Sequence, residues 1–141
     1  MNISPELLGE IVSHVLEDPG NEVCGVIAVD PAAAGSDVAD AVRVLRATNI
    51  HRSPLKFEID PDELLALWKE IESEGLELGG IYHSHVRSAP YPSQTDVNFA
   101  ANWPGVEWII VGLAPGAEPE VRSYSIDAGV VREVAVGGAV T

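Results

Sequence analysis

Two histidines and an aspartate lie close together in residues 81–96, which read IYHSHVRSAPYPSQTD. His83 and His85 are two positions apart, so in a β-strand both imidazoles point to one face of the sheet, about 6.6 Å apart along the strand. Asp96 follows a loop that is long enough to fold back toward them. Two imidazoles and a carboxylate give three protein ligands and leave a fourth position for a catalytic water, which is the pattern of a catalytic zinc site.

Other interpretations of the two histidines have to be weighed. Taken alone, they are equally well explained as half-exposed residues at the end of a strand. A structural zinc site would use four ligands with more thiolates than the single Cys24 provides. A cupin-type site, which shares the two-histidine spacing, needs a further histidine on a later strand, and none follows His85. We therefore take His83, His85 and Asp96 as candidate ligands for one Zn²⁺ per chain.

Two further residues offer the proton chemistry that such a site needs. Glu22 opens an apolar run, so its carboxylate is expected at the edge of the core, where it can act as a general base on a metal-activated water. Ser93 can donate a hydrogen bond to a developing oxyanion. Each also has a simpler interpretation, Glu22 as a solvated residue at the start of a strand and Ser93 as the N-cap of a short helix.

Several neighbouring residues have competing interpretations. Cys24 shares the face of Glu22 on a strand and is either part of a cleft floor or, as we favour, a small buried thiol. Gly79 and Gly80 either allow close approach of a peptide backbone or mark a β-bulge. For His14 we favour a place on the surface or in helix packing. For His51 we favour a place in a solvated loop rather than in the wall of a groove.

Hydrophobic periodicity and turn residues indicate which elements position these side chains. Helices are predicted at 4–18, at 60–76 with a buried stripe of Leu64, Leu67, Trp68 and Ile71, and at 93–103; the three tryptophans, Trp68, Trp103 and Trp108, are expected in the core. Strands are predicted at 22–30, 38–49, 57–60, 77–85, 106–114 (central), 120–127 and 130–136, with a turn at Ala128-Gly129. This order indicates an α/β or α+β fold with a mixed sheet flanked by helices.

Length and composition limit the remaining classes. A chain of 141 residues, 46% of them hydrophobic, suits one domain, which we place at 1–135 with a tail at 136–141 and one flexible insertion at 31–37. The net charge of −14 argues against nucleic acid as a partner. A single cysteine, no apolar run long enough for a membrane span and no secretory signal favour a cytoplasmic protein without a membrane partner.

The spacing of these residues resembles a known family. Glu22, then His83-Ser84-His85, then Ser93 and Asp96 fit the motif E…H-[S/T]-H-x7-S-x2-D of the JAMM (MPN+) metalloproteases. The resemblance covers about residues 1–135 and implies an MPN fold, which is cytidine deaminase-like. It implies zinc bound by His83, His85 and Asp96, with Glu22 as the base and Ser93 holding the tetrahedral intermediate.

The resemblance also suggests a substrate. The stretch NEVCGVIAV and the loop after His85 are similar to the compact prokaryotic Mec-type members, which release cysteine from the C-terminal tail of a ubiquitin-like sulfur-carrier protein in cysteine biosynthesis. Isopeptide cleavage, as in deubiquitinase-like members, and a non-catalytic MPN scaffold are the alternatives. Val86 stands where many members have proline, so an altered loop geometry and altered substrate preference are expected, with Pro90 and Pro92 stiffening the loop instead.

Overall fold

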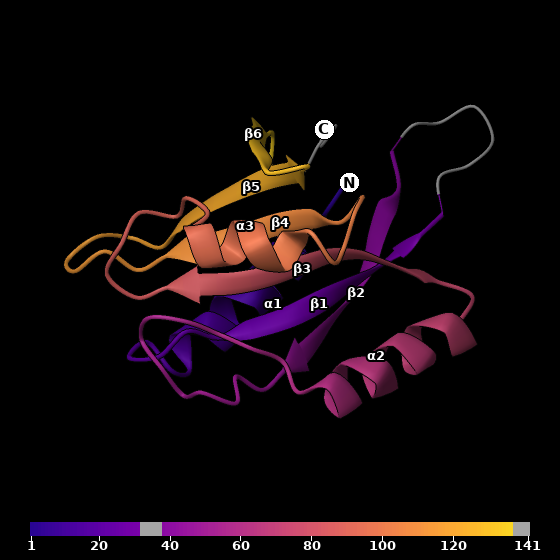
Figure 1. The fold of residues 1–141 in the computed structure, drawn as a ribbon, viewed down its shortest axis with the longest axis horizontal. Helices are drawn as coiled ribbons and strands as arrows, with labels where there is room; N and C mark the ends of the chain where they lie inside the picture. The colour runs from indigo at the N-terminus through magenta and orange to yellow at the C-terminus, as the bar shows by residue number, and fades with distance from the viewer. Residues whose placement is uncertain (32–37, 137–141) are drawn as a thin grey trace.

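The computed structural model describes residues 1–31 and 38–136 as an α+β fold built on one mixed sheet (Figure 1). The elements in chain order are α1 (Pro5–Leu16), β1 (Cys24–Asp30), β2 (Asp40–Ala47), α2 (Pro61–Ser73), β3 (Glu77–His85), α3 (Gln94–Ala100), β4 (Glu107–Gly112), β5 (Glu120–Asp127) and β6 (Val130–Val134). The predicted loop at 31–37 and tail at 136–141 fall almost wholly outside the described residues.

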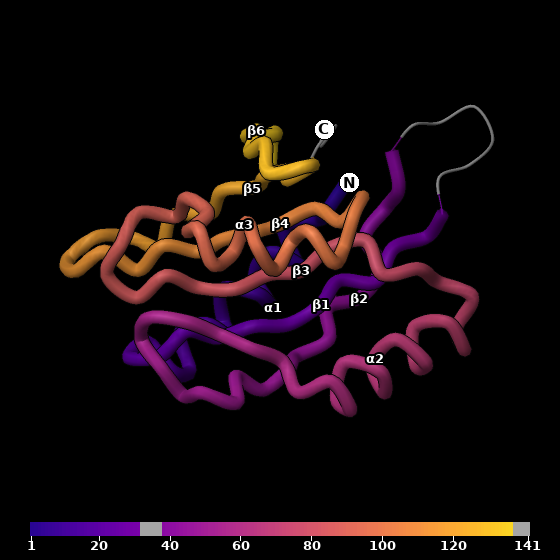
Figure 2. The backbone as a smooth tube through the Cα atoms, in the orientation of Figure 1, coloured from indigo at the N-terminus to yellow at the C-terminus, as the bar shows by residue number. Residues whose placement is uncertain are grey.

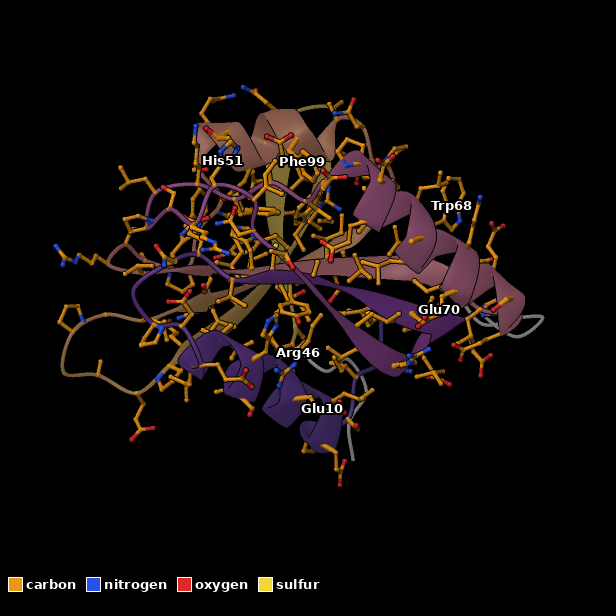
Figure 3. All side chains as sticks on the ribbon, turned by 90° about the horizontal axis from the view of Figure 1, so that it is seen from below. Glu10, Arg46, His51, Trp68, Glu70 and Phe99 are labelled. Atoms are coloured by element: carbon orange, nitrogen blue, oxygen red, sulfur yellow. The ribbon has the colours of Figure 1, made fainter. Side chains whose placement is uncertain are left out.

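The sheet has the strand order β2-β1-β3-β4-β5-β6, in which only β3 and β4 run parallel. The predicted central position of β4, made from an unbroken apolar run, is confirmed. Figure 3 views the sheet nearly edge-on, with α1 on one side and α2 and α3 on the other. Glu10 and Arg46 lie on the side of α1, whereas His51, Phe99 and Trp68 lie on the opposite side.

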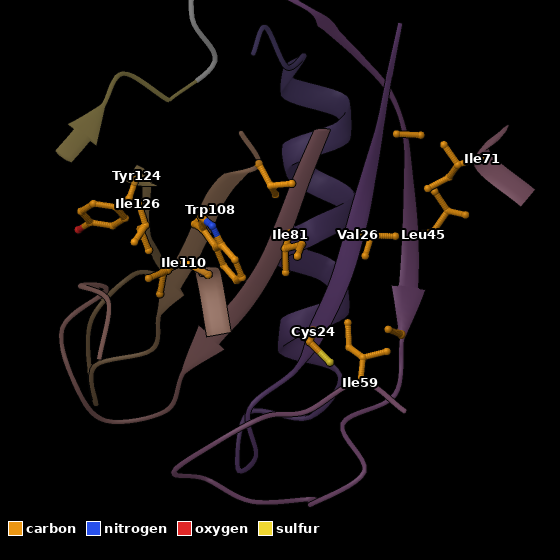
Figure 4. Close-up of a cluster of buried hydrophobic side chains, with 14 residues drawn as sticks. Cys24, Val26, Leu45, Ile59, Ile71, Ile81, Trp108, Ile110, Tyr124 and Ile126 are labelled. Carbon is orange, nitrogen blue, oxygen red and sulfur yellow. The ribbon is translucent and has the colours of Figure 1, made fainter. Parts of the chain in front are cut away.

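Successive side chains along a strand point to opposite faces of the sheet, so the core is divided into one cluster on each face. Cys24, Val26 and Ile81 face α2 and α3 and join the cluster drawn in Figure 4, which includes Trp108 and Ile110. Ile27, Tyr82 and Ile109 face α1, where Ile11 and Val15 of the helix are fully buried. His83 and His85 have the parity of Ile81, so both side chains lie on the α2/α3 face at the end of β3.

Local signals explain the element boundaries. The Ser4 side chain caps α1 by accepting from the Leu7 N–H, and Asp60 caps α2 in the same way through the Asp62 N–H. The β5–β6 turn has positive φ at both Ala128 (50°) and Gly129 (79°), as a two-residue hairpin turn of this hand requires. The predicted turn at Ala128-Gly129 is therefore confirmed.

Two parts of the sequence prediction are wrong. Residues 57–60 form no strand, since the segment makes only an isolated bridge between Asn49 and Ile59. Trp68 is 44% exposed rather than in the core, because the buried stripe of α2 runs through Leu64, Leu67 and Ile71 and places Trp68 on the outer side. Trp103 is half-buried, and Trp108 is fully buried as expected.

The loops at one end of the sheet come from distant parts of the chain. Figure 2 shows the segments before β1, after β2, after β3 and after β4 gathered at the left end of the molecule. Strand β3 runs toward this end and finishes there at His85 (Figure 1). Within the described residues, no helix is both long enough and apolar enough to cross a membrane.

Candidate metal centre

The structure brings His83, His85 and Asp96 together as the sequence predicts. The two histidines end β3, and Asp96 lies in the first turn of α3, which the loop 86–93 folds back over the sheet. All three residues are buried, with exposed fractions of 0%, 5% and 4%. They form a group of metal-binding residue types whose ligand atoms lie within 4.8 Å of one another.

The distances between the three candidate ligand atoms match those expected around a tetrahedrally coordinated zinc ion. Nε2 of His83 lies 3.2 Å from Nε2 of His85, and the two nitrogens lie 3.1 and 3.2 Å from Oδ2 of Asp96. Ligand atoms bound to zinc at 2.0–2.1 Å in tetrahedral geometry are expected about 3.3 Å apart. The three atoms therefore already form one triangular face of the tetrahedron that the ion would occupy.

The hydrogen bond of His85 Nδ1 leaves Nε2 of the same ring to hold either a proton or a cation against Asp96. Its Nδ1 lies 2.8 Å from the carbonyl oxygen of Ala89, which can only accept, so the ring proton is on Nδ1. In the neutral ring, Nε2 then has a lone pair that faces the carboxylate of Asp96. Two acceptors in contact require a proton or a metal ion between them, and the Ala89 carbonyl is the type of second partner that metal-binding histidines use.

The electrostatics of the group keep Asp96 ionised. Burial by itself raises the pKa of Asp96, but hydrogen bonds from His83 and His85 outweigh it and hold the pKa well below its usual range. Burial lowers the pKa of His83. Burial also acts to lower the pKa of His85, but the hydrogen bonds to Asp96 and Ala89 leave it raised. Nδ1 of His83 has no hydrogen-bond partner among the described residues.

Both interpretations of Ser93 are compatible with its geometry. Ser93 and Asp96 form a capping box, in which the Ser93 hydroxyl accepts from the Asp96 N–H (3.1 Å) and Asp96 Oδ2 accepts from the Ser93 N–H (2.9 Å). The N-cap role is thus established by the contacts. Because capping uses the oxygen of the hydroxyl, its proton remains available for a further acceptor, and Ser93 is exposed.

Glu22 is buried beside the three candidate ligands. The pairing of β1 with β3 sets Cys24 opposite His83, and bonds between Val23 and Ser84 continue it, so Glu22 lies opposite His85. Glu22 is 7% exposed, which rules out the interpretation as a solvated residue. Burial raises its pKa to about 7, with His85 acting to lower it and Asp96 to raise it. A carboxylate with a pKa near neutrality can both accept and return a proton.

The neighbouring residues are mostly structural. Cys24 is fully buried in the core cluster, and burial raises its pKa to about 12, so it is the small buried thiol that we favoured. Gly79 lies at the bulge between β1 and β3, far from the histidines in the strand, so the bulge interpretation is confirmed. His14 packs on the other face through a 2.6 Å contact between its Nδ1 and the Tyr82 hydroxyl.

Sequence reasoning missed several residues around the site. Phe57 stacks on His83 with ring centroids 4.5 Å apart. Tyr124 donates from its hydroxyl to the Pro90 carbonyl at 2.5 Å, which anchors the loop after β3 next to Ala89. Val86, the unusual residue of that loop, is buried. A phenylalanine in a loop and a tyrosine in a distant strand have no spacing signal, so only the fold reveals them.

A groove runs from the site along α3. Its wall includes Phe57, Phe99, Trp103 and Asp96, with His51 and its partner Glu58 at the rim. His51 lies in a loop and is exposed, as we favoured, and its side chain also lines the rim of this groove. The aromatic lining next to a candidate ligand gives an extended apolar segment a surface on which to lie.

Comparisons with known proteins identify the family. The family model described as prokaryotic homologs of the JAB domain matches residues 4–127. The CysO-cysteine peptidase of Mycobacterium tuberculosis is 35% identical over 131 residues, covering 93% of this chain and 86% of the relative. The desampylase of Haloferax volcanii is 36% identical over 115 residues, covering 78% of each.

A solved structure agrees with this assignment. A protein from Desulfitobacterium hafniense superposes with a TM-score of 0.80 at 28% identity, covering 94% of this chain and 88% of that one. The relatives named as peptidase and desampylase indicate a hydrolase, and the predicted MPN fold is confirmed. The chain therefore belongs to the prokaryotic branch of the JAB (JAMM/MPN+) domain family.

Proposed function

We propose that this protein is a zinc-dependent peptidase that cleaves the bond after the C-terminal tail of a small ubiquitin-like protein, and that it releases cysteine from a sulfur-carrier adduct. The observation that carries the metal assignment is the buried triangle of His83, His85 and Asp96, whose facing nitrogen and oxygen atoms lie 3.1–3.2 Å apart. The similarity to the CysO-cysteine peptidase over 93% of the chain supports the substrate.

We assign a role to each residue of the site. Zinc held by His83, His85 and Asp96 would supply a Lewis acid that polarises the scissile carbonyl and makes water more acidic. Glu22, buried opposite His85, takes the proton of the attacking water and returns it to the leaving amine. The free hydroxyl proton of Ser93 is donated to the developing oxyanion.

Metal analysis tests the first part of the proposal. Purified protein should contain about one zinc per chain, and His85→Ala or Asp96→Ala should reduce this sharply. His51→Ala is the matched control, since His51 is an exposed histidine outside the triangle and should leave the zinc content unchanged. A zinc content that is the same in all four proteins would contradict the assignment of the ligands.

Mass spectrometry on two substrates tests the reaction. The enzyme is incubated with a sulfur-carrier protein extended by a C-terminal cysteine and, separately, with an isopeptide-linked conjugate of a ubiquitin-like protein. Release of cysteine is expected, and Glu22→Ala should keep zinc while losing turnover. Cleavage of the isopeptide alone would support the second candidate, an isopeptidase, which the 36% identity to a desampylase favours. If zinc-loaded protein cleaves neither substrate, the remaining interpretation is that the protein is a non-catalytic scaffold.

A further inference from the structure

The buried side chain of Asn49 forms hydrogen bonds with four backbone groups. Asn49 follows β2 and is 8% exposed. Its Nδ2 donates to the carbonyls of Glu22 and Lys56, both at 3.0 Å, and its Oδ1 accepts from the N–H groups of His51 and Glu58, both at 3.1 Å. An amide side chain has two donors and one oxygen with two lone pairs, so Asn49 uses its full hydrogen-bonding capacity.

These four bonds close the segment 50–58 around the amide. The ends of the segment also meet directly, since the Ile50 N–H donates to the Glu58 carbonyl at 3.0 Å and Asn49 bridges to Ile59. The segment therefore forms a compact loop built around one buried side chain. The predicted strand at 57–60 fails for the same reason, because the Glu58 N–H is used by Asn49 and not by a neighbouring strand.

Glu22 is held by this loop through both of its backbone groups. Its carbonyl accepts from Asn49, and its N–H donates to the Ser53 carbonyl at 2.8 Å. Glu22 precedes β1, and the bonds that continue the β1–β3 pairing end at Val23, so the backbone groups of Glu22 bond to the loop instead. The loop around Asn49 is what fixes its backbone, and therefore the point from which its carboxylate starts.

The same loop covers one of the candidate metal ligands. Phe57, the residue before Glu58, stacks on the His83 ring with an interplanar angle of 26° and meets Phe99 edge-on at 5.8 Å. One buried amide thus fixes the backbone of the candidate base and the aromatic ring over one candidate ligand. No bond of Asn49 goes to a ligand itself.

We propose that Asn49 is a positioning residue for hydrolysis, which holds Glu22 at the distance from the metal site that proton transfer needs. The inference rests on the proposed role of Glu22 as the base. Asn49 touches no reacting atom, so its loss should lower the rate of the chemical step without removing the metal. A misplacement of about 1 Å can reduce turnover by about 100-fold.

The most informative variant is Asn49→Asp. Aspartate keeps the size of the side chain and one acceptor, but it puts an oxygen that cannot donate against the two carbonyls of Glu22 and Lys56. We expect kcat to fall by about 10- to 100-fold, with KM and zinc content near the wild-type values. The matched control is Asn98→Asp, the same change at an exposed position of α3 whose oxygen accepts from Gln94 at 2.9 Å; it should stay within about twofold of wild type.

Two further measurements keep the inference testable if Asn49→Asp folds poorly. Asn49→Ala removes the four bonds without adding a charge and should show the same loss of kcat. Amide hydrogen exchange of the wild-type protein should show protection at His51, Glu58 and Glu22, lost together in Asn49→Ala. Exchange of these three amides at unprotected rates in the wild type would overturn the inference without any variant.

Glu22→Gln, measured in parallel, separates this inference from the proposed function. Suppose that Glu22→Gln is folded but inactive, and that zinc-loaded Asn49 variants turn over at the wild-type rate. The positioning role of Asn49 is then wrong, and the assignment of Glu22 as the base stands. If Glu22→Gln is fully active, the base assignment itself fails. A loss in Asn49→Asp that appears only in KM or in zinc content would also refute the positioning role.

Discussion

Replacing Glu22 by glutamine is expected to stabilise the metal-free protein at neutral pH while it abolishes turnover. The buried carboxylate has no hydrogen-bond partner among the described residues, and burial raises its pKa from the ordinary value of 4.5 to about 7. Ionised Glu22 is therefore unfavourable in the folded protein. Glutamine has nearly the same shape and no charge, so it removes this penalty together with the base.

The direction and size of the effect follow from the two pKa values. Below pH 4.5 the carboxyl is protonated in both folded and unfolded chains, and the variant gains little. Between pH 4.5 and 7 only the unfolded chain loses its proton, so the wild-type protein becomes less stable as the pH rises, and above pH 7 the difference is constant. The full difference between the two pKa values corresponds to roughly 3 kcal/mol in the free energy of unfolding. Water that still reaches the carboxylate screens part of it, which leaves about 1–2 kcal/mol.

Urea unfolding of chelator-treated protein at pH 4.5 and pH 8 measures this difference. The midpoint of Glu22→Gln should exceed that of the wild type at pH 8 and approach it at pH 4.5. Glu118→Gln, a change of an exposed glutamate in the loop after β4, is the matched control and should show no such dependence on pH. Equal stability of Glu22→Gln and wild type at pH 8 would refute the reasoning, as would a less stable variant.

Three further predictions concern other parts of the fold. Gly25→Ala places a Cβ 2.3 Å from the buried Tyr82 ring and should destabilise by about 3 kcal/mol in urea unfolding, whereas Gly9→Ala, in open space on α1, should stabilise by about 1 kcal/mol; equal effects would contradict the packing. Ala128→Asn, at a positive φ that asparagine tolerates better, should raise the melting temperature by a few degrees in a thermal scan, and a decrease would speak against the turn geometry. Tyr124→Phe removes the bond to Pro90 and should weaken zinc binding by about tenfold in a chelator competition, with an unchanged affinity as the contrary result.

The sequence was sufficient for those features that depend on periodicity or spacing. The two-residue interval of His83 and His85 sets both rings on one face, and proline and capping residues mark the start of α1 and α2. Glu22 could be nominated from its place at the start of an apolar run, but its position opposite His85 could not be predicted, because that strand pairing joins residues more than sixty positions apart. Trp68 was misplaced since a helical stripe has two edges, and periodicity does not say which edge meets the sheet.

The segment around Asn49 shows the other limit of sequence reasoning. Its residues have the β-branched and aromatic types of a strand, and the prediction at 57–60 followed them. The side-chain amide of Asn49 competes for the backbone groups that a strand would use. Its hydrogen bonds form in place of a strand because Asn49 is buried and all four of them are made. Such a competition depends on a residue nine positions away, which local propensity does not contain.

The capping box of α3 has a consequence for how a metal ion would be gained and lost. The carboxylate oxygen of Asp96 that faces the histidines is already immobilised by the Ser93 N–H, and the His85 ring is immobilised by the Ala89 carbonyl. Little conformational entropy remains to be lost at these two ligands when an ion arrives, because folding of the chain has already ordered them. Unlike small domains that are unfolded without zinc, this protein is expected to keep its fold when the ion leaves, so depletion and resupply of zinc would act as a reversible switch of activity.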